Sequence, residues 1–367
     1  MNLLKKLLFL FVVISLFPVD SKSQENTKDS LLAVMKNFHL TAYMDVYYSY
    51  DYIKEYSKPD TVRIFSSFAP YNNEFRLNLA YVLMRYENDK VRANLGFRAG
   101  DMPLLLTPVD KRFIQYIKEA NFGTKLGEKT WLDLGYMPNP VGIESSVAID
   151  NFLSSISLCG YLEPSSLLGI KLSHEFSKKL RAALLVYNSY SIASANNNNK
   201  VLAINLKYTP SDDFLLTFNS TFGDEGEGED IVKLNSYNNI FCKYSYKNKV
   251  DFIAQLDFSA QGNSQKTDST QTAYMVSGLA VLRYKISPKF NISSRFDYIS
   301  DPDGFMSNGE GGSKDNLKAY SFTLGIEYRP FENIFFRIEN QHMHFNQKLY
   351  DNKDERYNIL LSSGIKL

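Results

Sequence analysis

The sequence predicts an all-β protein: a transmembrane antiparallel up-and-down β-barrel of about 16 strands with a long third loop folded inward. Three observations indicate this fold. From residue 38 onward, apolar and polar residues alternate with a period of two. Long and short connections between these segments alternate strictly. Aromatic residues make up 14% of the chain although mean hydropathy is only −0.27, as expected when an apolar outer face and a polar lumen are averaged.

The N-terminus has the features of a cleaved secretory signal peptide. Lys5 and Lys6 precede an apolar run over residues 7–17, and small residues follow shortly before Gln24. The run is too short to span a bilayer as a helix, which needs roughly 20 apolar residues. We therefore expect three parts: a signal peptide at 1–23, a short N-terminal segment at 24–37 and a barrel domain at 38–367.

Charge and cysteine content narrow the function classes. The 41 Lys and Arg nearly balance the 40 Asp and Glu, which argues against a nucleic-acid partner, because such proteins carry a basic surface. Later segments never reach 18 consecutive apolar residues, so helical membrane spans are excluded. Cys159 and Cys242 are too few for a disulfide framework, and their separation fits no metal pattern.

The first and last predicted strands should pair to close the barrel. Residues 38–52 alternate between Leu40, Ala42, Met44, Val46, Tyr48 and Tyr50 on one face and Thr41, Tyr43, Asp45, Tyr47, Ser49 and Asp51 on the other. Residues 357–367 alternate in the same way. A barrel in a membrane must pair these two strands, since no sheet edge can face lipid.

A hairpin over residues 75–99 predicts a charged lumen. We expect its outward residues to be Phe75, Leu77, Leu79, Tyr81 and Leu83 on the first strand and Val91, Ala93, Leu95, Phe97 and Ala99 on the second. The opposite face carries Arg76, Arg92 and Arg98. Three arginines would be costly in a protein core, so they predict a water-filled interior.

The remaining strands extend the same two-faced pattern. By alternation with apolar neighbours, further charged residues fall on the lumen face: basic Arg295 and acidic Asp133, Asp251, Asp257 and Asp297. A Lys or Arg near the bilayer midplane would cost about 2–4 kcal/mol on the lipid face, which fixes the face assignment. The alternative of a strand over 152–161 would make the strand number odd, so we assign that segment to the loop.

The long loop at 138–165 begins at Pro138 and Pro140, which cannot donate to a sheet ladder. It carries Glu144, Asp150 and Glu163. We expect Glu144 and Asp150 to face the basic wall formed by the three hairpin arginines, which would create a transverse field at a constriction. The alternative is that these acids only fasten the loop to the wall through ion pairs.

Residues 132–169 also carry a family resemblance. The matching residues are Leu132-Asp133-Leu134-Gly135, Pro140, Gly142, Glu144, Asn151, Ser155, Ser157, Pro164 and Gly169, together with the strand segment from Tyr43 to Tyr50. This pattern resembles the β-barrel porins of the OmpL-like type in the Gram-negative outer membrane. The resemblance implies a water-filled channel for passive diffusion of small hydrophilic solutes, surrounded by outer-membrane lipid and without a cofactor.

Other functions remain open from the sequence. A substrate-selective channel for an anion, sugar or peptide needs the same wall, whereas an adhesin barrel would not need an inward loop. No catalytic motif is present; a barrel phospholipase would require a Ser beside outward-facing His174. His342 and His344 share one strand face but lack an evident third metal ligand. We therefore expect neither an enzyme nor a metal site; the sequence does not indicate oligomeric state, for which a homotrimer is one candidate.

Overall fold

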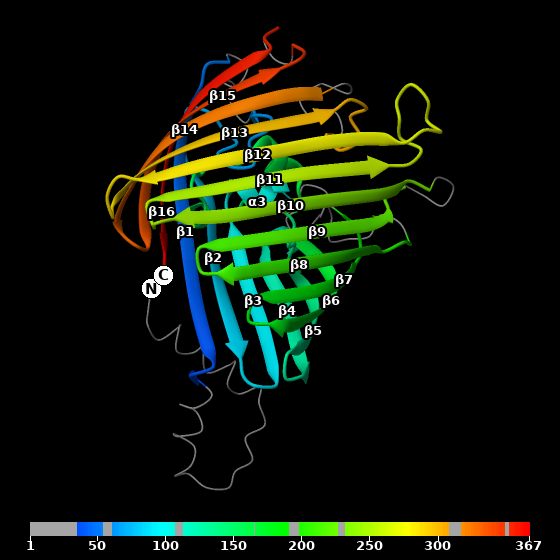
Figure 1. Cartoon of the computed structure of the whole chain (residues 1–367). Helices are drawn as coiled ribbons and strands as arrows, with labels where there is room; N and C mark the ends of the chain where they lie inside the picture. The colour runs from blue at the N-terminus through cyan, green and yellow to red at the C-terminus, as the bar shows by residue number, and fades with distance from the viewer. Residues whose placement is uncertain are drawn as a thin grey trace. The chain divides into compact units, whose positions relative to one another are not determined.

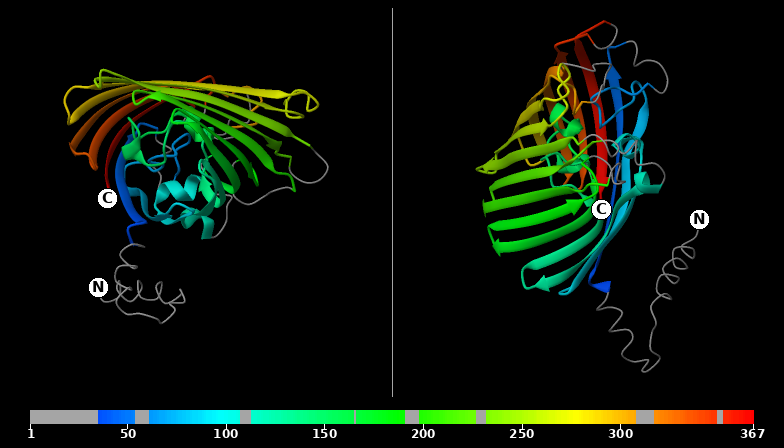
Figure 2. Two further views of the ribbon diagram at one scale, coloured as in Figure 1. Left: turned by 60° about the horizontal axis from the view of Figure 1, so that its bottom comes forward. Right: turned by 90° about the vertical axis from the view of Figure 1, so that its right-hand side faces the viewer.

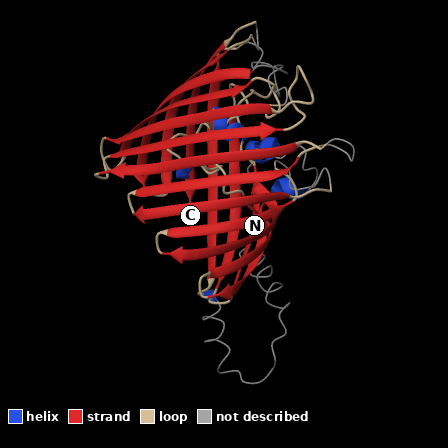
Figure 3. Ribbon diagram, turned by 45° about the vertical axis from the view of Figure 1, so that its right-hand side comes forward, coloured by secondary structure: helices blue, strands red, loops and turns tan. Residues whose placement is uncertain are grey.

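Sixteen antiparallel strands form a closed barrel in the computed structural model (Figures 1 and 3). The structure describes residues 35–53, 61–106, 113–164, 166–190, 198–226, 232–307, 317–348 and 352–367. The strands are β1 Phe38–Asp51, β2 Phe75–Glu87, β3 Val91–Ala99, β4 Ile117–Gly127, β5 Thr130–Pro138, β6 Ser166–Ser177, β7 Leu180–Tyr187, β8 Val201–Ser211, β9 Phe214–Asp224, β10 Leu234–Tyr246, β11 Val250–Gln261, β12 Ala273–Lys285, β13 Phe290–Asp301, β14 Leu317–Phe331, β15 Ile334–Phe345 and β16 Glu355–Lys366. The predicted signal peptide and the part of the N-terminal segment at 24–34 lie outside the described residues.

The predicted strand number and closure are confirmed. Each strand pairs with its neighbour in sequence, and β1 pairs with β16 over nine residues from Tyr43↔Lys366 to Asp51↔Asn358. Seven short turns join the strands at the end of the barrel where β1 begins and β16 ends, and the long connections lie at the other end. In outer-membrane barrels the short turns are periplasmic and the long loops extracellular.

Alternation of burial follows the predicted faces on most strands. On β1 every odd residue from Tyr43 to Asp51 is buried, whereas Leu40 and Met44 are exposed. On β13 and β14 the apolar residues face outward except Ile299, Leu317 and Ala319 near the long-loop end, which are buried. Arg295 and Asp297 point inward and are buried. The outer surface is therefore apolar and the interior is polar, as two different solvents require.

Strand β2 departs from the expected pattern. Phe75 and Leu77 face outward as predicted, but Leu79, Tyr81 and Leu83 are buried, and Val82 and Met84 are exposed instead. Both Asn78 and Leu79 are buried, so two consecutive residues face inward and the alternation changes phase there. Asp45 of β1 stabilises this step, because its Oδ1 accepts a hydrogen bond from the Leu79 N–H at 2.9 Å. The prediction of outward Leu79, Tyr81 and Leu83 was therefore wrong.

The helices are short and belong to loops. They are α3 Asp101–Leu106, the 3-10 helices η2 Phe113–Tyr116 and η3 Ala148–Asp150, and α4 Leu158–Leu162. No helix in the described ranges has the length and apolarity needed to cross a membrane. Both η3 and α4 lie in the loop between β5 and β6, here called L3, which runs inside the ring of strands (Figure 2). The inward third loop and the absence of a strand over 152–161 are confirmed.

Candidate functional site

Contacts among its own residues stabilise the conformation of L3. Asn139 Oδ1 accepts from the Val141 N–H at 3.1 Å and turns the chain after Pro138. Gly142 has φ +82°, and a Cβ there would collide with the Glu163 carboxylate, so only glycine fits. Ser157 caps α4 by accepting from the Gly160 N–H at 3.0 Å.

Glu144 connects the two halves of L3. Its Oε2 accepts from the Ser157 N–H at 2.9 Å and from the Ser157 hydroxyl at 2.6 Å. Its Oε1 lies 2.9 Å from Nη1 of Arg295, whose side chain is 1% exposed. Asp297 Oδ2 accepts from Arg295 Nε at 3.0 Å. The Arg295 guanidinium is therefore held by two carboxylates, one from the loop and one from the wall.

Arginines of the wall also bind the L3 backbone. We call Arg295, Arg329 and Arg337 the docking arginines, because each donates to a carbonyl oxygen of L3: Arg295 to Ser155, Arg329 to Ile149 at 2.6 Å, and Arg337 to Ala148 at 2.7 Å and Asn151 at 2.6 Å. They come from β13, β14 and β15. A buried carbonyl without a partner would be costly, so these contacts let an irregular segment lie inside the barrel.

Acceptors on the same side of the barrel satisfy the N–H groups of L3. Glu339 accepts from Ser154 and Ser155, and Asp297 accepts from Leu158 at 2.9 Å. Asn239 and Gln255 accept from Gly142 and Ile143 at 3.2 and 3.0 Å. These wall residues lie on β10, β11, β13 and β15. L3 is thus fastened to the strands from β10 to β15.

Asp150 and Glu163 have different partners. Both oxygens of Asp150 lie 2.9 Å from Nζ of Lys366, near the end of β16, and both side chains are more than one third exposed. Glu163 accepts from the Gln255 amide. Enclosure between L3 and the wall raises the pKa of Glu163, and the nearby negative charge of Asp257 raises it further. Glu163 is therefore easier to protonate than an ordinary glutamate.

The predicted pairing of these acids with the hairpin arginines was wrong. Arg76 forms a two-fold contact with Asp101 of α3, at 2.7 and 2.9 Å. Arg92 forms a similar contact with Asp133, at 2.6 Å for both bonds. The hairpin has local carboxylates within reach, whereas L3 places Glu144 beside Arg295 of β13 and Asp150 beside Lys366 of β16. Of the three arginines only Arg98 lies beside L3.

The predicted acidic residues of the wall are buried within the barrel. Asp133 also lies 3.4 Å from Lys171, and Asp251 pairs with Arg283 at 2.5 Å and Lys285 at 3.3 Å. The other two serve L3 or its surroundings: Asp297 holds Arg295 and α4, and Asp257 accepts from Asn239 and Ser277 at 2.6 and 2.8 Å. Their lumen-facing placement agrees with the alternation.

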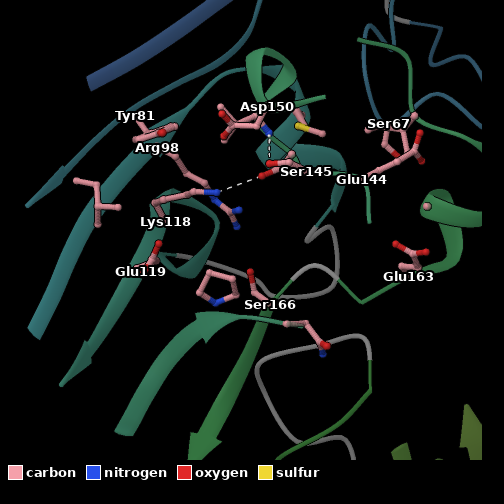
Figure 4. A pocket seen from close by; sticks show the side chains of 18 of the residues that line it. Ser67, Tyr81, Arg98, Lys118, Glu119, Glu144, Ser145, Asp150, Glu163 and Ser166 are labelled. Carbon is pink, nitrogen blue, oxygen red and sulfur yellow. Dashed lines mark hydrogen bonds between the residues drawn. The ribbon is translucent and has the colours of Figure 1, made fainter. Parts of the chain in front are cut away.

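A cavity of about 330 Å³ remains between L3 and the strands β2–β6 (Figure 4). Strand residues on its lining include Tyr81, Arg85, Arg98, Lys118 and Glu119. All three acids predicted on L3 line it as well: Glu144, Asp150 and Glu163. It reaches Thr41 and Lys366, which lie at the short-turn end of β1 and β16.

Two of the cations that line this cavity, Lys118 and Arg98, donate to neutral acceptors. Lys118 Nζ donates to the Ser146 hydroxyl at 3.1 Å. Arg98 donates to the Gln115 carbonyl at 3.0 Å and the Tyr136 hydroxyl at 3.3 Å. Arg85 lies 3.8 Å from Glu119 and is half exposed. Positive charge on the strands therefore faces negative charge on L3 across the cavity.

Several residues of the site were missed from the sequence. Arg337, Arg329 and Glu339 hold L3, yet each sits in an ordinary alternating strand. Lys118 and Arg85 line the cavity but lie near strand ends, where the alternation gave no signal. Inward-facing arginines on β13–β15 could have indicated that this wall holds the loop.

The remaining candidates lie on the outside. His174 Nδ1 is 2.8 Å from the Thr130 hydroxyl. His342 and His344 each have a ring nitrogen 3.9 Å from Glu355 Oε1. Within the described residues, no group of three or more His, Cys, Asp and Glu is placed to hold a metal ion.

Comparison with known families finds a match over residues 37–365 to the family described as "Putative beta-barrel porin-2, OmpL-like". No curated protein matches the sequence.

Solved structures with a similar fold are outer-membrane proteins. The outer membrane channel DcaP of Acinetobacter baumannii has a TM-score of 0.62 and 10% identity, with 90% of this chain and 97% of that chain covered. OprB of Pseudomonas putida has a TM-score of 0.59 and 10% identity, with 94% of this chain and 97% of that chain covered. The trimer form of OmpT of Vibrio cholerae has a TM-score of 0.54 and 10% identity, with 90% of this chain and 99% of that chain covered. At such identities the likeness concerns the fold.

Proposed function

The chain belongs to the putative β-barrel porin-2, OmpL-like family, and from this membership we propose how its channel conducts: small hydrophilic solutes diffuse passively through the cavity between L3 and strands β2–β6. The protein is a porin of the outer membrane. The cavity volume of about 330 Å³ is at the lower end of small-molecule sites, roughly 300–1,000 Å³. It suits small solutes. We further propose that the channel has no catalytic role.

Charge across the cavity supports a preference among these solutes. Arg98 and Lys118 donate to neutral acceptors, and no carboxylate among the described residues is in direct contact with either of them. Among the acids of the lining, Glu144 is paired with Arg295 and Asp150 with Lys366, both at 2.9 Å. Glu119 lies 3.8 Å from Arg85. The accessible charge of the passage is therefore biased toward positive, and we expect weak anion preference. A channel selective for a particular anion is the second candidate, and the same two cations favour it.

Reversal potentials in planar bilayers under a salt gradient test this proposal. The double variant Arg98→Gln/Lys118→Gln should shift selectivity from anions toward cations, because it removes two of the three positive charges that β2–β4 place on the cavity. The control Arg76→Gln/Arg92→Gln removes the same charge from arginines outside the cavity lining and should leave selectivity nearly unchanged. Equal shifts in the two variants, or no conductance in the wild type, would contradict the proposed path.

The alternative role of the L3 acids needs its own variant. Asp150→Asn removes a half-exposed carboxylate from the lining while leaving the Glu144–Arg295 contact in place. If Asp150 contributes to the electrostatic field across the cavity, the variant should prefer anions more strongly than the wild type and keep the same free energy of unfolding. An unchanged reversal potential would mean that Asp150 only fastens the loop. The trimer form of the OmpT structure supports the further proposal of a homotrimer.

A further inference from the structure

The turn between β10 and β11 has an unusual residue at its first central position. Lys249 N–H donates to the Tyr246 carbonyl at 2.9 Å, and both residues between them have positive φ, 48° for Lys247 and 51° for Asn248. This is a type I′ turn, in which Asn and Gly are favoured. A lysine carries a Cβ that disfavours the left-handed region. The backbone therefore does not explain why lysine is at position 247.

The two lysines of this turn lie over tyrosine rings of the outer surface. Lys247 Nζ is 5.1 Å from the centroid of the Tyr246 ring, and Lys249 Nζ is 5.4 Å from that of Tyr284. Tyr246 and Tyr284 are 49% and 43% exposed and face outward. They lie on β10 and β12, on either side of β11, where Val250 pairs with both. Cation–π contact thus holds two ammonium groups at the edge of the lipid-facing surface.

Neither ammonium has a carboxylate partner among the described residues. The acid of this hairpin, Asp251, points inward and pairs with Arg283 and Lys285. Two cations without a carboxylate partner therefore flank the outer face of β11 at the short-turn end of the barrel, which is the periplasmic end.

An apolar surface continues from the rings toward the middle of the barrel. Phe252 pairs with Leu282 and with Tyr244, and all three side chains are exposed and face outward. The surface therefore offers paired cations, then amphipathic rings, then hydrocarbon, in the order that the headgroup and acyl chains of a lipid require.

We propose that this surface binds an anionic phospholipid of the inner leaflet, with its phosphodiester oxygens between Lys247 and Lys249 and its acyl chains on Phe252 and Leu282. The positive charge of the two lysines determines which class of phospholipid headgroup binds. A zwitterionic headgroup would bring its own ammonium beside two lysines, and like charges at that distance repel. An anionic glycerol headgroup adds no positive charge. This site is independent of the solute path.

Native mass spectrometry of the detergent-solubilised barrel, titrated with phosphatidylglycerol, tests the site. We expect the variant Lys247→Asn/Lys249→Gln to weaken binding roughly 30-fold, the product of about fivefold per lysine at a membrane surface. Phosphatidylcholine should bind more weakly than phosphatidylglycerol to the wild type. Because asparagine is favoured at positive φ, Lys247→Asn should preserve the turn, and loss of binding would not reflect unfolding.

The matched control removes two lysines from another periplasmic turn. Lys178 and Lys179, between β6 and β7, have no ring contact in the part of the chain that the structure describes, so Lys178→Gln/Lys179→Gln should change the affinity less than threefold, an approximate bound from weak exposed-charge effects. If both double variants lost the same affinity for phosphatidylglycerol, net charge alone would explain the loss, and the proposed site would be contradicted. Unchanged phosphatidylglycerol affinity in the first variant would contradict it as well.

Amine labelling of the wild type gives a second readout without substitution. Adding phosphatidylglycerol should protect Lys247 and Lys249 from an amine-reactive reagent more than it protects Lys178 and Lys179. Equal protection of the four lysines would overturn the proposal, whatever the variants show.

Discussion

The buried guanidinium of Arg295 holds L3 to the wall through charge and hydrogen bonding together. It contacts Glu144 and Asp297 and donates to the Ser155 carbonyl. Arg295→Met should lower the free energy of unfolding by about 3–5 kcal/mol, because it leaves two carboxylates without their cation in a buried site. The midpoint of urea unfolding of the purified barrel, with its slope, measures the loss.

The matched control is Lys366→Met. Lys366 and Asp150 are 36% and 44% exposed, so that ion pair should contribute at most about 1 kcal/mol. Losses of similar size for Arg295→Met and Lys366→Met would show that burial does not decide the importance of these pairs.

Glu163 predicts a pH dependence of L3 docking. Its pKa in the folded state is raised by enclosure and by the charge of Asp257, so the folded protein favours the protonated form. This contribution to stability is fully present below the ordinary glutamate pKa of about 4.3 and is lost as pH rises through the folded pKa.

We expect protease cleavage within L3 to become faster as pH rises through the pKa of Glu163 in the folded protein. The variant Glu163→Gln should reduce this dependence of the cleavage rate on pH. The control Asp150→Asn alters an exposed acid of the same loop and should keep the pH dependence. An identical pH profile in Glu163→Gln and wild type would contradict this role of Glu163.

Among the elements, L3 is the one whose removal should change conduction most. Pro138 pairs with Ser166 across its base, so residues 140–164 can be replaced by a short Gly-Ser turn without separating β5 from β6. Single-channel conductance should rise severalfold, because the loop occupies the lumen and the docking arginines would then be hydrated. A folded variant with wild-type conductance would show that the constriction lies elsewhere.

Strand β2 illustrates which features of an element the sequence could predict. Its existence and extent followed from alternation, because a wall between lipid and water imposes a period of two. The phase change at Asn78 and Leu79 did not, since an apolar residue such as Leu79 fits either face when the lumen is partly filled by loops. The contact that fixes it, from the Leu79 N–H to Asp45, joins residues 34 apart.

For the whole molecule, strand number, closure and the inward loop could all be predicted. They depend on patterns repeated along the chain, and each hairpin is local in sequence. Pairing across the lumen could not be predicted: Arg295 and Glu144 are 151 residues apart, and Arg337 and Asn151 are 186 apart. Those contacts depend on the path of one loop through a space that only the closed barrel defines.

The path of L3 through the lumen divides the barrel wall into two parts that differ in how well their inner faces tolerate substitution. Strands β10–β15 hold the backbone of L3, so a substitution on their inner face would disturb folding. The inner face of β2–β4 contacts the cavity and has fewer such obligations. Diversification of solute preference among related chains should therefore concentrate on β2–β4, and a designer who wishes to retune permeability should begin there.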